Sequence, residues 1–113
     1  MLEKKIEEAV NTYAKERGLL VYKFTSPNNR SVCDRMFVSS TGKVWFVEFK
    51  ATGKKPTPAQ TRHHQTLAQR GVTVYVVDSI ALGKEIVEHE SQSSWPGHHW
   101  AAIRYTGGNE VVT

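Results

Sequence analysis

Two acidic side chains and one lysine have the types and the spacing of a hydrolytic site. Asp34 begins one apolar run, and Glu48 and Lys50 come near the end of the next. Residues 39–43 between the runs are typical of a hairpin loop, which predicts that Asp34 lies opposite Glu48, with Cβ atoms roughly 5 Å apart. Lys50 follows Glu48 by two residues and is therefore expected on the same sheet face.

These residues predict a metal site. Two carboxylates directly opposite each other repel, and a divalent cation offsets that repulsion. An open site rich in oxygen ligands suits Mg²⁺ or Mn²⁺, and Lys50 would hold a water molecule or stabilise charge developing at a phosphate. A second interpretation fits the pattern equally well: Asp34 and Glu48 lie at the sheet edge, and Lys50 forms an exposed salt bridge.

Hydrophobic periodicity predicts the elements that position these residues. Helices are expected at 2–17, 57–70 and 79–89, and strands at 20–25, 34–38, 44–51 and 72–77. A capping box of Thr57 and Gln60, with Pro58 between them, opens the second helix, and Asp78 or Ser79 caps the third. The strand–helix–strand order predicts a right-handed crossover and a mixed sheet. Residues 90–97 are expected to form a loop, and 100–105 and 110–112 a small late hairpin.

Composition and charge set the broad class. A chain of 113 residues with 39% hydrophobic and 23% charged residues has the size of one globular domain. One cysteine excludes a disulfide framework and a cysteine-rich zinc site. No apolar run reaches the length of a membrane span, so a cytoplasmic, intracellular protein is expected. Residues 1–78 carry a net charge of +6 and residues 79–113 carry −2, which is compatible with a polyanionic partner.

The motifs resemble a known nuclease family. Asp34 within the Cys33-Asp34-Arg35 segment, followed by Phe46-Val47-Glu48-Phe49-Lys50, looks like the motif of the PD-(D/E)XK superfamily and, more narrowly, of VRR-NUC nucleases from phages and bacteria. The similarity covers about the first 80 residues and includes Lys23, the basic loop at 54–56, the Pro-x-Gln that opens the second helix, and the strand at 72–77. Cys33 stands where the family usually has proline.

The resemblance implies a restriction-endonuclease-like α/β fold, with a mixed sheet flanked by helices, and a role for each matching residue. Asp34, Glu48 and the Phe49 carbonyl would bind Mg²⁺ or Mn²⁺, Lys50 would orient the attacking water, and Gln60 would support the site. Glu7, or Glu3 as the second choice, would be the acidic residue of the first helix. The basic side chains expected to hold DNA are Arg30, Arg35, Lys54, Lys55, Arg62 and Arg70, although Arg35 could instead pair with an acid.

The family also implies the partners and the division of the chain. It suggests a homodimer that cuts branched DNA such as a four-way (Holliday) junction and leaves a 5′-phosphate. Residues 1–80 would form the nuclease core, and residues 81–113 an extension of the same domain that could supply the dimer interface. A non-catalytic nucleic-acid-binding module and an assembly subunit remain alternatives.

The cysteine and the histidines are not expected to take part in the chemistry. Cys33 lies on an apolar strand and is expected to pack there rather than react. His63 and His64 are adjacent on a helix, diverge by about 100°, and cannot face one ion together. His98 and His99 are expected at the surface, with DNA contact or a subunit interface as alternatives.

Overall fold

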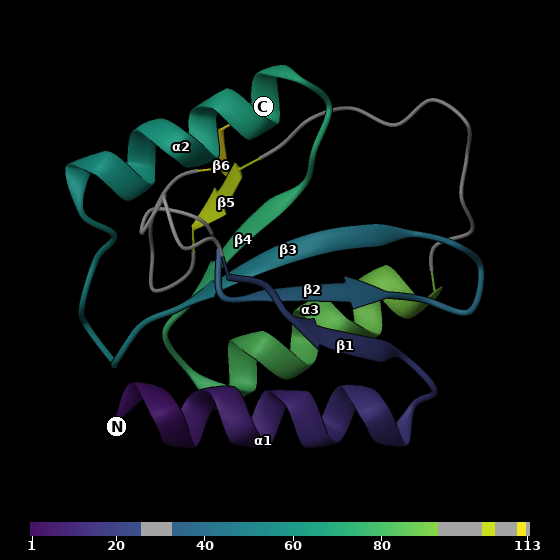
Figure 1. Cartoon of the computed structure of the whole chain (residues 1–113). Coiled ribbons are helices and arrows are strands. Elements are labelled where there is room, and N and C mark those ends of the chain that lie inside the picture. Colours follow the sequence, from purple (N-terminus) through teal and green to yellow (C-terminus); the bar gives the residue numbers. More distant parts are fainter. Residues whose placement is uncertain (26–32, 93–102, 106–110, 113) are drawn as a thin grey trace.

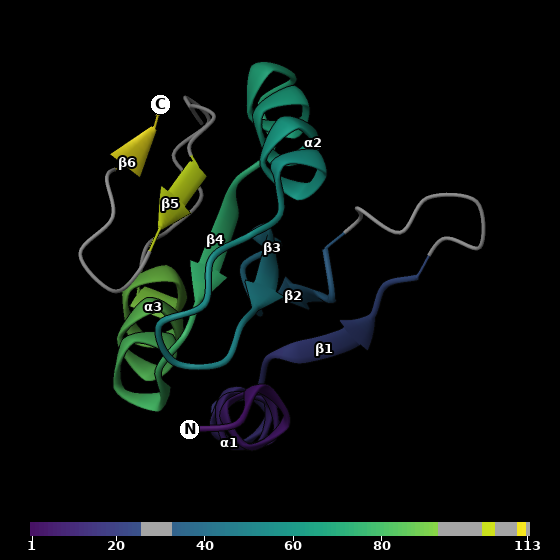
Figure 2. The same ribbon diagram turned by 90° about the vertical axis from the view of Figure 1, so that its left-hand side faces the viewer.

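A three-layer α/β architecture is present in the computed structural model, which describes residues 1–25, 33–92, 103–105 and 111–112. Helix α2 covers one face of a central sheet, and helices α1 and α3 cover the other (Figures 1 and 2). The predicted α/β class is therefore confirmed. The helices are α1 (Glu3–Glu16), α2 (Pro58–Gln69) and α3 (Ile80–Gln92), and the strands are β1 (Leu20–Lys23), β2 (Arg35–Val38), β3 (Val44–Phe49), β4 (Val74–Val77), β5 (Ile103–Tyr105) and β6 (Val111–Val112).

The sheet is mixed, as predicted, with strand order β1-β2-β3-β4-β5-β6. The first three strands form antiparallel pairs, β3–β4 and β4–β5 are parallel, and β5–β6 is antiparallel. All four residues of β4 are buried, which agrees with the continuous apolar run that predicted a strand covered on both faces. Helix α2 makes the connection between the parallel strands β3 and β4.

The hairpin has the register that the loop length predicts. Val38 pairs with Val44, and Met36 pairs with Phe46. Inside the loop, the Ser39 Oγ accepts a hydrogen bond of 3.0 Å from the Lys43 N–H, and Gly42 has a φ of +86° that suits glycine. These contacts fix the pairing, and the pairing decides which side chains meet at the far end of the hairpin.

Alternation along β3 divides its side chains between two environments. Trp45, Val47 and Phe49 are buried on the face covered by α1 and α3, and Trp45 stacks on Phe37 at 5.7 Å between ring centroids. Ile6 and other residues spaced along α1 join this core. The intervening residues of β3 project toward α2, and Glu48 is one of them.

The capping box of α2 is confirmed in full. The Thr57 Oγ1 accepts a hydrogen bond from the Gln60 N–H at 3.1 Å, and the Gln60 Oε1 accepts one from the Thr57 N–H at 2.9 Å. Pro58 occupies the first turn. This reciprocal arrangement fixes the position of the Gln60 side chain at the start of the helix.

The third helix is longer than predicted. Residues 90–92, expected to begin a loop, continue α3 to Gln92. Glu90 is 3% exposed, accepts a hydrogen bond of 2.5 Å from the Tyr75 hydroxyl, and forms an ion pair with Lys43 of the hairpin loop. These partners lie far from Glu90 in the chain, so tertiary contacts extend the helix beyond its local pattern. Ser79 is the capping residue, because its Oγ accepts a hydrogen bond from the Leu82 N–H.

The described part of the tail agrees with the predicted late hairpin. Strands β5 and β6 pair within the two segments expected for it. His98 and His99, which are expected at the surface, lie outside the described residues. The division at residue 80 and the dimer interface therefore stay predictions. Among the described residues, no helix is long and apolar enough to cross a membrane.

Helices α1 and α3 cross at a point that leaves no room for a side chain at Gly83. A Cβ atom there would lie 2.4 Å from the Val10 Cγ2 atom and 3.2 Å from the Val77 Cγ1 atom. We therefore expect Gly83→Ala to lower the free energy of unfolding by about 1–3 kcal/mol in urea titrations, despite the better helix propensity of alanine.

The matched control is the same substitution in a Val10→Ala background. Removing the Val10 methyl groups leaves the 3.2 Å contact with the Val77 Cγ1 atom as the one close approach, so Gly83→Ala should cost much less stability there. An equal loss of stability in both backgrounds would show that the close approach to Val10 is not the cause.

Candidate active site

The hairpin brings Asp34 and Glu48 together at one end of the sheet. The β2–β3 pairing ends at Arg35 and Val47, and the next residue on each strand is one of the two acids. The Asp34 Oδ2 accepts a hydrogen bond of 2.8 Å from the Phe49 N–H, and the Asp34 and Glu48 carboxyl groups are close enough for each to shift the pKa of the other. The predicted juxtaposition is confirmed.

The two carboxyl groups are strongly perturbed. Burial, the largest cause, and the neighbouring Glu48 carboxylate together raise the pKa of Asp34 to about 7. The hydrogen bond from the Phe49 N–H favours the charged form and opposes this rise. Burial also raises the pKa of Glu48 to about 7. Because both groups cannot ionise cheaply side by side, the pair keeps a proton to a higher pH than two free carboxyl groups would.

Glu48 lies in the interior of the protein. Its side chain belongs to β3, which lies between β2 and β4, and the residue is 2% exposed. The alternative interpretation, in which the acids lie at a sheet edge with an exposed salt bridge to Lys50, is therefore wrong for Glu48. A buried acid that is not at an edge requires specific partners.

Two side chains of α2 supply those partners. The Gln60 Nε2 donates a hydrogen bond of 3.2 Å to the Glu48 Oε2, and the His64 Nε2 lies 3.4 Å from the Glu48 Oε1. The Gln60 amide is thus held at both ends, by the capping box through Oε1 and by Glu48 through Nε2. The structure places Gln60 in the site, as predicted.

His64 is the site residue that sequence reasoning missed. It is 0% exposed, and burial, helped by the positive charge of Lys50, lowers its pKa to about 4. At neutral pH its contact with Glu48 therefore joins a neutral imidazole to a carboxyl group and is not an ion pair. The available signal was the i, i+4 spacing from Gln60, which puts both residues on one helix face.

Lys50 follows β3 directly, and its positive charge acts on the same cluster. Its ammonium group lowers the pKa of Glu48, as expected for a residue two positions along the same strand face. The Lys50 N–H donates a hydrogen bond of 2.9 Å to the Val77 carbonyl, and this contact fixes the backbone beside the acids. The structure therefore brings the aspartate, glutamate and lysine of the motif together.

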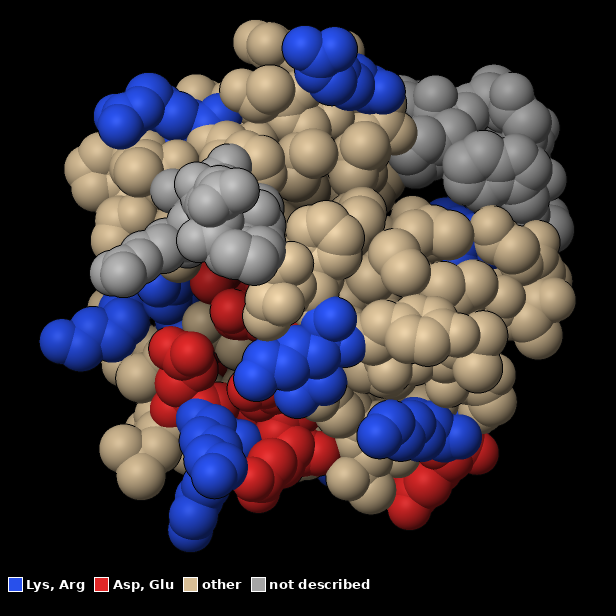
Figure 3. All heavy atoms as spheres, viewed as in Figure 1, with Lys and Arg blue, Asp and Glu red and all other residues tan. Residues whose placement is uncertain are grey.

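Two acidic residues of α1, Glu3 and Glu7, interact electrostatically with Asp34. Burial raises the pKa of Glu3, and the negative charge of Asp34 raises it further. Glu7 accepts a hydrogen bond of 2.6 Å from the Arg35 Nε and also raises the pKa of Asp34. Figure 3 shows acidic side chains gathered between α1 and the left-hand end of the sheet, with Lys and Arg side chains around them. Both predicted acids of this helix are close to the site.

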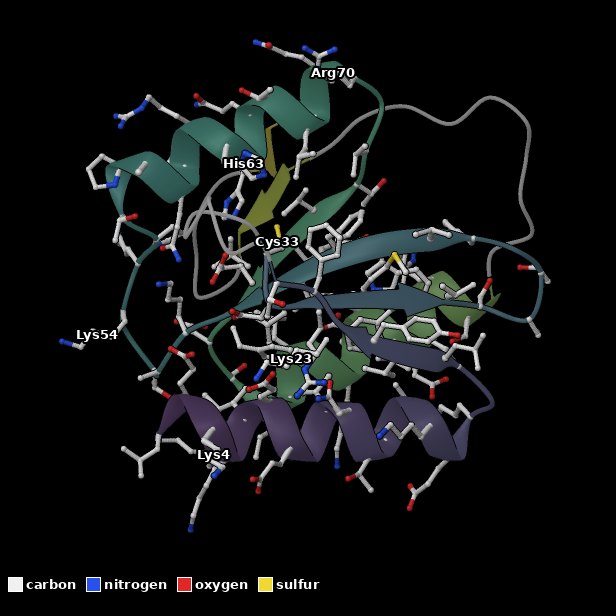
Figure 4. All side chains as sticks on the ribbon, in the orientation of Figure 1. Lys4, Lys23, Cys33, Lys54, His63 and Arg70 are labelled. Carbon is white, nitrogen blue, oxygen red and sulfur yellow. The ribbon has the colours of Figure 1, made fainter. Side chains whose placement is uncertain are left out.

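The basic side chains predicted to contact DNA differ in exposure and in distance from the acids. Arg35 is paired with Glu7 and is half-buried, whereas Lys54, Lys55 and Arg62 are exposed. Figure 4 places Lys54 beside the site end of the sheet and Arg70 at the opposite end of α2. Arg30 lies outside the described residues, and Lys23 is exposed at the end of β1.

Cys33 lies beneath α2 (Figure 4), and its Sγ lies within 4.8 Å of ligand atoms of Glu48 and His64. It is 1% exposed, and burial raises the pKa of its thiol, with the charges of Glu48 and Asp34 raising it further. A thiol that keeps its proton is a poor nucleophile. The expected packing role therefore fits its environment, although the side chain lies against polar neighbours as well as apolar ones.

The donor set fits a divalent cation. Two neighbouring carboxyl groups with raised pKa values can exchange a proton for a divalent cation, which removes their repulsion. Oxygen ligands of this kind suit Mg²⁺ and Mn²⁺. The residues that would hold the ion are Asp34 and Glu48, with the Phe49 carbonyl as the predicted third ligand.

The fold and the arrangement of acids define a protein of the restriction-endonuclease-like α/β class. A solved structure described as a VRR_NUC domain superposes with a TM-score of 0.71 and 30% identity, covering 77% of this chain and 95% of that one. The protein named "Putative nuclease p44", from Acyrthosiphon pisum secondary endosymbiont phage 1, is 44% identical over 77 residues, which are 68% of this chain and 83% of that protein. No family model matches the chain. On these similarities the chain belongs to the VRR-NUC family of nucleases.

The pKa values of the acids predict how stability depends on pH. Asp34 ionises near pH 4 when unfolded and near pH 7 when folded, so the free energy of unfolding falls as pH rises from about 4 to about 7. Asp34→Asn removes this loss. In urea titrations without metal, we expect the variant to exceed the wild type by about 1–3 kcal/mol at pH 8, and by nothing near pH 4.

Comparing two proteins isolates the effect of Asp34, because His64 has a lowered pKa and contributes the opposite pH dependence in both. Lys54→Ala, at an exposed position, should change stability equally at every pH and serves as the control. A gain for Asp34→Asn that is the same at pH 4 and pH 8 would contradict the raised pKa.

Proposed function

We propose that this nuclease is a Mg²⁺- or Mn²⁺-dependent DNA endonuclease that hydrolyses phosphodiester bonds. The observation that carries the proposal is the pair of Asp34 and Glu48 carboxyl groups, side by side at the end of the sheet with Lys50 next to them. When bound there, a divalent ion would polarise the phosphate and acidify a water molecule.

The chain's own residues then have separate tasks. Lys50 orients the water and offsets negative charge that develops at the phosphate. Gln60 keeps the Glu48 carboxylate turned toward the site, which its two hydrogen bonds favour. An acid of α1 supports the site: Glu7 by sequence position, or Glu3, on which Asp34 and Lys50 both act electrostatically.

DNA is the proposed substrate because of the charges around the acids. Lys54, Lys55 and Arg62 are exposed on the segments that follow β3 and can contact the phosphate backbone without reading bases. Arg30 and Arg35 are further candidates; Arg35 would have to leave Glu7 to contact DNA. The similarity to a phage protein named as a nuclease fits an enzyme that acts on DNA inside a cell.

Branched DNA cut by a homodimer is the finer part of the proposal. The described residues supply one such site, and symmetric cleavage of a two-fold four-way junction needs two. The chemistry and the preference for a junction are separate claims, so they have separate tests.

Lys50→Ala tests the chemistry. We expect it to reduce the cleavage rate at saturating DNA and Mg²⁺ by at least about 100-fold, since it removes charge stabilisation and water positioning together. DNA binding, measured by fluorescence anisotropy in Ca²⁺, should survive. Lys54→Ala is the matched control: it should weaken DNA binding and leave the saturated rate within about twofold of the wild type.

Three results would contradict the enzymatic proposal. Metal-independent DNA binding with no cleavage in Mg²⁺ or Mn²⁺ would favour a non-catalytic binding module. An absence of DNA binding would favour an assembly subunit. Cleavage that continues in EDTA would refute the metal dependence.

Mixed dimers test the junction proposal. Wild type mixed with excess Asp34→Asn should form dimers that cut one strand of a four-way junction, giving nicked junctions in place of resolved duplexes. Light scattering should give twice the 12.7 kDa chain mass. Equal rates on linear, flap and four-way DNA, or a monomer that resolves junctions, would refute the branched-DNA dimer.

A further inference from the structure

A second group of potential metal ligands shares Glu48 with the proposed Mg²⁺ site. Ligand atoms of Cys33, Glu48 and His64 lie within 4.8 Å of one another. The three residues come from separate parts of the fold, namely the segment before β2, strand β3 and helix α2. Each is at most 2% exposed, so the fold, and not a chance meeting at the surface, holds them together.

The imidazole of His64 has unused capacity to bind a ligand. Its Nε2 lies 3.4 Å from the Glu48 Oε1, and its Nδ1 is buried without a hydrogen-bond partner within the described part of the chain. A fully buried polar atom without a partner is costly and calls for an explanation. A metal ion bound through Nδ1 would provide one directly, whereas an ion bound through Nε2 would leave Nδ1 as the N–H of the ring.

The donor atoms favour a different ion from the one expected at the carboxylate pair. Sulfur, imidazole nitrogen and carboxylate oxygen are the three donor types that bind Zn²⁺ in proteins, whereas Mg²⁺ prefers oxygen alone. We propose that Cys33, Glu48 and His64 form a Zn²⁺ site, and that Zn²⁺ bound there inhibits the nuclease by occupying Glu48. The inhibition rests on the proposed function; the Zn²⁺ site does not.

Distances and charges support this assignment. Ligands of a tetrahedral zinc ion, with bonds of about 2.0–2.3 Å, lie roughly 3.3–3.7 Å apart. The observed separations of up to 4.8 Å need side-chain rotations that bring the outermost donors about 1 Å closer. On binding, the Cys33 thiol releases its proton to water, and the thiolate and the Glu48 carboxylate neutralise the two charges of the ion. The fourth coordination position is left for water.

Cobalt provides a direct test in the full-length protein. Co²⁺ added to the reduced, metal-free chain should produce a sulfur-to-cobalt charge-transfer band, and stoichiometric Zn²⁺ should remove it while millimolar Mg²⁺ should not. The band has one possible source, since the chain contains one cysteine. If no band forms in the wild type, or if Mg²⁺ removes it as readily as Zn²⁺, the proposal is wrong.

Variants identify the ligands. Cys33→Ser should abolish the band. Both Cys33→Ser and His64→Gln should weaken Zn²⁺ binding by more than about 100-fold, measured by competition with a chromophoric chelator. Loss of a residue that only supports a metal ligand weakens binding by at most about that factor. His63→Gln is the matched control, because His63 is the neighbour of His64 outside the cluster, and it should bind Zn²⁺ as the wild type does. Folded Cys33→Ser that binds Zn²⁺ as tightly as the wild type would overturn the site.

Cleavage assays separate the two claims. At saturating Mg²⁺, Zn²⁺ should inhibit the wild type, and Cys33→Ser should cleave DNA normally but need at least about tenfold more Zn²⁺ for the same inhibition. Equal inhibition of both would overturn the inhibitory role. A cobalt band in a protein that cleaves no DNA would uphold the Zn²⁺ site and refute the proposed function. Cleavage of DNA by a protein that forms no cobalt band would refute the Zn²⁺ site and uphold the proposed function.

Discussion

The rest of the site depends on holding two carboxyl groups side by side, one half-buried at Asp34 and one fully buried at Glu48. Burial and mutual repulsion both oppose this arrangement, as the raised pKa values of Asp34 and Glu48 show. Three parts of the fold impose it. The hairpin register puts the acids on adjacent positions, the Phe49 N–H holds the Asp34 carboxyl group, and α2 holds the Glu48 carboxyl group through Gln60 and His64.

Distant parts of the molecule contribute to this arrangement. The Lys43–Glu90 ion pair connects the hairpin loop to α3, and Glu90 also binds the Tyr75 hydroxyl of β4. A hairpin anchored at its loop cannot slip by one residue, and a slip would turn Glu48 toward the opposite face of the sheet. Contacts at one end of the sheet therefore protect the geometry at the other.

Local patterns were enough to predict much of this. The helix starts, the hairpin register and the Asp34–Glu48 pair follow from periodicity, capping chemistry and loop length, all of which act over a few residues. The extent of α3 could not be predicted, because Glu90 is held by Lys43 and Tyr75, which are distant in the chain. The place of His64 in the site follows from its spacing of four residues from Gln60, which puts both on one helix face, and not from its neighbour His63. The burial of Glu48 follows from its place between β2 and β4, which depends on the whole sheet.

The acidic cluster surrounded by basic side chains (Figure 3) also has a thermodynamic consequence. A polyanion that approaches this end of the sheet is attracted by the lysines but repelled by the carboxylates, unless a cation neutralises them. Binding of the cation and binding of the polyanion are therefore coupled, and each must increase the affinity for the other by the same factor. Under the proposed function, a low metal concentration would lower the affinity for DNA as well as the cleavage rate. An enzyme without its ion would therefore tend to dissociate from DNA.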